Sequence, residues 1–73
     1  MTRRRYTIVI ERGAKSFGAF VPDLPGCVAV AKTRSAVVKS IRQAVELHVE
    51  DLQMQGIPLP RAAAMADSVE VAF

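Results

Sequence analysis

The chain has 73 residues, of which 51% are hydrophobic, so we expect a single small domain over residues 1–73 and not a disordered protein. Its one cysteine excludes an internal disulfide and fits a reducing compartment, which favours a cytoplasmic protein. No apolar run approaches the length of a membrane span or a signal-peptide core, so we expect no membrane association.

Charge is divided unevenly along the chain. Residues 1–42 hold nine of the ten basic residues and two of the seven acidic ones, whereas residues 43–73 hold one basic residue and five acidic ones. Such a split favours an acidic partner, a nucleic acid or antiparallel self-association. Two solvated faces of opposite charge explain it equally well.

Alternating apolar residues predict strands over residues 6–11, 17–22 and 69–73. A further short strand is predicted over residues 27–31, between the second and the last of these. With a helix before the last strand, the order is β-β-β-α-β. We expect an α+β fold with a four-stranded sheet of order 3-2-1-4 and the helix packed on one face. The other face stays partly apolar, which predicts a homodimer or higher homo-oligomer formed through that face or an edge strand.

The helix is predicted over residues 34 to about 55. Thr33 precedes it as a suitable N-cap, because its hydroxyl can accept a hydrogen bond from an unpaired backbone N–H of the first turn. Gly56 suits the left-handed position after a helix, and Pro58 prevents its continuation. The apolar residues between these limits fall on one stripe, as expected for a helix that covers a sheet.

The segment 21–27 is the most specific part of the sequence. Two prolines and a glycine restrict its backbone between two strands, which predicts a structural corner made of Pro22, Pro25, Gly26 and Cys27. Asp23 and Leu24 stand at the tip of this corner. We consider both as contacts for a partner, with a local turn cap as the alternative role of Asp23.

This corner, the Gly56-Ile57-Pro58 exit from the helix and the β-β-β-α-β order together resemble the HicB-like antitoxin family. The resemblance implies a partial ribonuclease-H-like fold and a non-catalytic protein that neutralises a small HicA-like RNA-cleaving toxin by covering its active surface. Many members also carry a C-terminal DNA-binding segment. We do not expect one here, because the predicted fourth strand reaches the last residue.

The acidic half of the chain is the natural side to face a basic toxin. On the predicted helix, Leu47 and Met54 lie one heptad apart and away from the main apolar stripe. Together with the corner tip, the helix supplies the candidate partner-binding residues Asp23, Leu24, Glu46, Leu47, Glu50 and Met54.

Two alternatives remain open. The basic half could contact nucleic acid through Arg3, Arg4, Arg5, Lys32, Arg34, Lys39 and Arg42. Only Tyr6 lies beside the N-terminal arginines, so no aromatic platform for stacking bases is evident. The chain could also be a homo-oligomeric domain with no toxin partner.

No catalytic or metal-binding set is evident, so we expect no enzyme and no cofactor. Cys27 and the single histidine, His48, have no third residue to orient them, and both are expected in the core. Hydrolysis by two metal ions needs several carboxylates at one place. Glu11, Asp23, Glu46 and Asp67 show no such convergence in the sequence.

Overall fold

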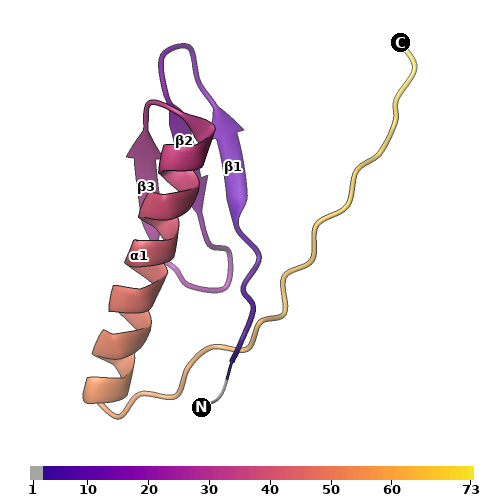
Figure 1. The fold of residues 1–73 in the computed structure, drawn as a ribbon. Helices are drawn as coiled ribbons and strands as arrows, with labels where there is room; N and C mark the ends of the chain where they lie inside the picture. Colours follow the sequence, from indigo (N-terminus) through magenta and orange to yellow (C-terminus); the bar gives the residue numbers. More distant parts are fainter. Residues whose placement is uncertain (1–2) are drawn as a thin grey trace.

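The computed structural model describes residues 3–73, and its ordered core is a three-stranded sheet followed by one helix (Figure 1). The elements are β1 (Val9–Arg12), β2 (Phe17–Phe20), β3 (Val28–Ala31) and α1 (Arg34–Met54). Both neighbouring pairs are antiparallel, and the sheet order is β1-β2-β3. In the described part of the chain β1 therefore has one edge without a neighbouring strand.

The limits of α1 follow the predicted signals. The Thr33 hydroxyl accepts the backbone N–H of Ala36 at 3.1 Å, as an N-cap does. At the other end Gly56 has a φ of 71°, and the Ile57 N–H donates to the Leu52 carbonyl at 2.9 Å. This left-handed glycine with a hydrogen bond back into the last turn is a Schellman arrangement. The predicted start and end of the helix are confirmed.

The helix α1 packs against β3 and β2 and covers one face of the sheet (Figure 1). Between the two layers lies a small core whose buried side chains are Ala19, Val21, Leu24, Cys27, Val37 and Ile41. On the uncovered face Phe20, Val28 and Val30 are 37%, 64% and 72% exposed. One sheet face is therefore buried and the other is open and apolar, as the sequence predicts.

The prediction of a four-stranded sheet of order 3-2-1-4 is wrong. Within residues 3–73 the sheet has three strands, and no strand forms after α1. The side chains of Val69, Val71 and Phe73, expected to pack in the last strand, are 86%, 68% and 119% exposed. Alternation measures the tendency to form a strand, but a strand also needs an edge to pair with. Beyond Ala64 the chain runs away from β1 (Figure 1).

Candidate functional site

The corner between β2 and β3 is closed by its own backbone. The Leu24 N–H donates to the Val21 carbonyl at 3.1 Å, the Cys27 N–H to the Leu24 carbonyl at 3.1 Å, and the Val21 N–H to the Cys27 carbonyl at 3.2 Å. Gly26 has a φ of 84°, which favours glycine at this position. These contacts turn the corner inward.

Leu24 was a candidate contact residue at the tip of the corner, but the structure buries it. Its side chain is 0% exposed and belongs to the core between the sheet and α1. A leucine between two prolines looks like the tip of a loop in the sequence, but the hydrogen-bonded turn points it inside. It acts as a core residue and is not available to a partner of the folded chain.

Asp23 lies next to Leu24 and holds a segment from the far end of the chain. One of its carboxylate oxygens accepts the backbone N–H groups of Ala63 and Ala64 at 3.0 and 2.9 Å. The Thr7 hydroxyl donates to the Ala64 carbonyl at 2.8 Å, and the Tyr6 hydroxyl donates to the Pro60 carbonyl at 2.6 Å. We call this set of contacts the clasp; it ties residues 60–64 to the corner and to the segment before β1.

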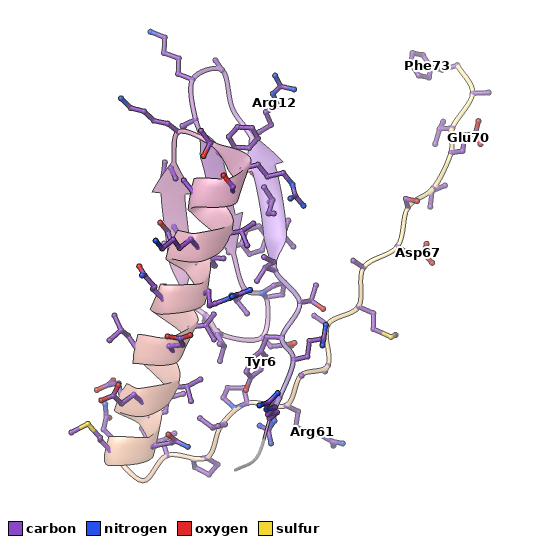
Figure 2. The ribbon with its side chains drawn as sticks, in the orientation of Figure 1. Tyr6, Arg12, Arg61, Asp67, Glu70 and Phe73 are labelled. Atoms are coloured by element: carbon purple, nitrogen blue, oxygen red, sulfur yellow. The ribbon has the colours of Figure 1, made fainter. Side chains whose placement is uncertain are left out.

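Figure 2 shows the consequence of the clasp. Tyr6 and Arg61 lie where the N-terminal and C-terminal segments meet, while Asp67, Glu70 and Phe73 lie along the part of the chain that has left the folded core. We call residues 65–73 the arm. The clasp has no signal in the sequence, because its backbone partners carry no side-chain pattern that could identify them.

Cys27 is buried and free, with 4% of its surface exposed. Burial raises the pKa of its thiol, because the charged thiolate loses solvation. A raised pKa lowers the fraction of the nucleophilic thiolate at neutral pH. The geometry gives Cys27 the role of a small apolar core residue at the corner.

A groove of about 1110 Å³ runs between α1 and the segment that leads into β1. Its walls include apolar side chains, among them Ile8, Val38, Val45 and Val49. Charged residues also line it, and these are Arg3, Arg4, Arg5, Arg42 and Glu46. The groove is therefore apolar in its walls and mostly basic in its charged lining.

The proposed nucleic-acid contacts do not form one surface around this groove. Of the seven basic residues considered, only Arg3, Arg4, Arg5 and Arg42 line it, and Arg4 also donates to the Leu59 and Pro60 carbonyls at 3.3 and 2.9 Å. Lys32 and Arg34 stand at the connection from β3 into α1, and Lys39 is exposed on α1.

The acidic and apolar candidates on α1 are at the surface. Leu47 and Met54 are 68% and 81% exposed, and Glu46 and Glu50 are exposed beside them. Helical periodicity places these residues on one side of α1, away from Val37 and Ile41 in the core. We call Glu46, Leu47, Glu50 and Met54 the helix strip; it presents two carboxylates and two apolar side chains together.

The carboxylates considered for metal chemistry do not converge. Across residues 3–73 no three His, Cys, Asp or Glu residues lie close enough to hold a metal ion. Over the same range no helix is both long and apolar enough to cross a membrane.

The comparison with known families decides the identity of the domain. Residues 6–72 match the model of the HicB-like antitoxin of bacterial toxin–antitoxin systems. The chain belongs to this family. The resemblance based on the corner and the helix exit is thereby confirmed.

Individual relatives agree with the assignment of this HicB-like chain. It is 33% identical over 66 residues to a UPF0150 protein of Helicobacter pylori, covering 89% of this chain and 92% of the relative. A UPF0150 protein of Synechocystis is 32% identical over 57 residues, which are 77% of this chain and 72% of that one. A chain of the solved HicA3 and HicB3 toxin–antitoxin complex superposes with a TM-score of 0.65 at 31% identity, covering 85% of this chain and 70% of the other.

Proposed function

We propose that this HicB-like chain is an antitoxin that neutralises a small HicA-like, RNA-cleaving toxin by binding it and covering its active surface. The likeness to a chain of the HicA3 and HicB3 complex, at 31% identity over 85% of this chain, carries the proposal. The match to the family model over residues 6–72 supports it. In this proposal the chain acts by binding alone, and it meets its toxin in the cytoplasm, where the RNA targets are.

The helix strip is the proposed toxin-binding surface. A protein that cleaves RNA needs cationic side chains to hold the phosphates of its substrate. Glu46 and Glu50 offer carboxylates to such side chains, and the exposed Leu47 and Met54 offer apolar contacts beside them. Complementary charge speeds association, and apolar contacts that exclude water slow dissociation. Asp23 contributes indirectly, because its carboxylate is engaged by the clasp.

The test uses a small HicA-like toxin, sought first in the gene adjacent to that of this chain, which is co-expressed with the wild-type antitoxin and with variants. We expect Leu47→Asp combined with Met54→Asp to lose protection against the toxin and to weaken complex formation at least tenfold in a calorimetric titration. The matched control is Val30→Asp, because Val30 is exposed to a similar extent, 72%, on the open sheet face. Wild-type affinity in the double variant would rule out the helix strip, and failure of the wild-type chain to bind any such toxin would rule out the function.

Direct nucleic-acid binding is the alternative, and the convergence of four arginines on one groove favours it. Binding through phosphate contacts falls steeply with salt, since each neutralised phosphate releases counterions. A titration of the chain alone with single-stranded RNA at several salt concentrations separates the two proposals. Tight, salt-dependent RNA binding by the chain without a toxin supports the alternative, and it is abolished when the groove arginines are replaced.

A further inference from the structure

The arm carries a strand pattern that its own domain does not use. Val69, Val71 and Phe73 alternate with smaller or charged residues, and they are among the most exposed apolar side chains of the described chain. Three such side chains on a short segment represent apolar surface that association would remove from water. The clasp ends at Ala64, so residues 65–73 leave the folded core from a fixed point.

The domain also presents an edge and a groove that fit a segment of this kind. Among residues 3–73 no strand pairs with the outer edge of β1, so this edge can accept an added strand. The groove lies next to the segment that leads into β1, and its apolar walls include Ile8 of that segment and Val38, Val45 and Val49 of α1. A strand added at this edge and continued along the segment before β1 would place alternate side chains against those walls.

The charges that line the groove also favour the arm as its occupant. Arg3, Arg4, Arg5 and Arg42 line the groove with a single acid, Glu46. The arm has the opposite balance, because Asp67 and Glu70 are its charged side chains. An acidic, apolar strand therefore complements a groove with apolar walls and a basic lining.

The direction and length of the arm favour pairing with a second copy of the chain over pairing with its own domain. Beyond Ala64 the arm runs away from its own β1 (Figure 1), and Asp67, Glu70 and Phe73 all lie clear of the sheet (Figure 2). Nine extended residues span about 30 Å. This length exceeds the two shorter dimensions of the molecule, 26 and 20 Å, so the arm can cross a neighbouring domain.

We infer that two copies of this chain exchange their arms, and that residues 65–73 of each pair along β1 and the segment that leads into it in the other copy and cover its groove. Within one chain the sheet keeps three strands, and the added strand comes from the second copy. The exchange is reciprocal, as a two-fold symmetric dimer requires. This inference is independent of toxin binding, because it concerns the chain alone.

The first test measures the mass of the full chain in solution by sedimentation across a concentration series. We expect a dimer for the wild type and at least a tenfold higher dissociation constant for Val71→Lys, which places a cation beside the groove arginines. Val30→Lys is the matched control, since Val30 is 72% exposed and Val71 68%, and it alters the open sheet face instead. Circular dichroism checks that both variants keep their fold.

The second test identifies the contact directly. A photo-reactive amino acid replaces Phe73, and isotope-labelled and unlabelled copies are mixed before irradiation. We expect cross-links between the arm of one copy and β1 or the groove of the other, seen as mixed-isotope peptides. A monomeric wild type, a Val71→Lys variant that associates as tightly as the wild type, dissociation caused by Val30→Lys alone, or cross-links only within one copy would each overturn the inference.

Discussion

The carboxylate of Asp23 accepts the backbone N–H of Ala64 at 2.9 Å, although 41 residues separate the two in sequence. The same oxygen accepts the Ala63 N–H at 3.0 Å. One side chain of the corner between β2 and β3 therefore fixes the point at which the arm leaves the domain. The corner thus has a role beyond joining two strands.

Replacing Asp23 by alanine is expected to release residues 60–64. Hydrogen bonds to a charged group are stronger than neutral ones, so we expect a loss of about 1–2 kcal/mol in the free energy of unfolding at this half-buried site. Amide hydrogen exchange should show faster exchange at Ala63 and Ala64 while α1 keeps its protection. The exposed Glu11→Gln provides the control, and unchanged protection of Ala63 and Ala64 in Asp23→Ala would contradict the clasp.

Leu24→Ala tests the placement of Leu24 in the core. Because the side chain is 0% exposed, its truncation should cost about 2–5 kcal/mol, which is a large share of the stability of so small a domain. Leu47→Ala, at 68% exposure on the helix strip, should change stability by no more than about 0.5 kcal/mol. Urea unfolding followed by circular dichroism compares the two, and equal effects would place Leu24 at the surface.

Substitutions of Gly26 distinguish the effect of backbone strain from that of steric crowding. A Cβ at this position would meet no atom within 4 Å, so the cost of Gly26→Ala comes from its φ of 84° alone. We expect a loss of about 1–2 kcal/mol from holding alanine in a left-handed conformation. Gly26→Asn should lose less, since asparagine tolerates this region better. The ranking of the thermal midpoints checks this, and an alanine variant as stable as the wild type would exclude strain.

The charges at the ends of α1 oppose the helix dipole, because its first turn holds no acid and its last turn no base. Arg34→Glu should therefore stabilise the helix by about 0.3–1 kcal/mol at low salt, with a smaller gain at high salt. Lys39→Glu makes the same change of charge beyond the first turn and serves as the control. If the two variants shift the thermal midpoint equally, the dipole is not the cause.

The raised pKa of the Cys27 thiol predicts a loss of stability at alkaline pH. Its folded pKa is raised above the ordinary value of 9.0, so the folded state holds the proton more tightly than the unfolded chain. Its contribution is complete below the unfolded pKa and is lost as pH rises towards the folded pKa. Urea unfolding at neutral pH and above about pH 9 should show the wild type losing more stability than Cys27→Ala. Parallel losses in both proteins would contradict the prediction.

Local chemistry lets the sequence determine the limits of α1, the turn at Gly26 and the presence of three strands before the helix, whereas the bounds of β1 and β2 differ from the predicted 6–11 and 17–22. Thr33 and Gly56 act on backbone groups within a few residues of themselves, so their effects are already present in the order of residues. The same is true of Gly26, whose positive φ follows from the turn it occupies. The family could also be identified from these segments, because they are the specific parts of the chain.

Tertiary structure alone decided which candidates reach the surface and what the end of the chain does. The burial of Leu24 and the bonds from Asp23 to Ala63 and Ala64 depend on segments about forty residues apart meeting in space. Residues 69–73 alternate as a strand does, but whether such a segment pairs depends on an available edge, and the prediction that it completes the sheet of its own chain is wrong. A strand is completed by a neighbour, and alternation within one segment does not say where that neighbour is.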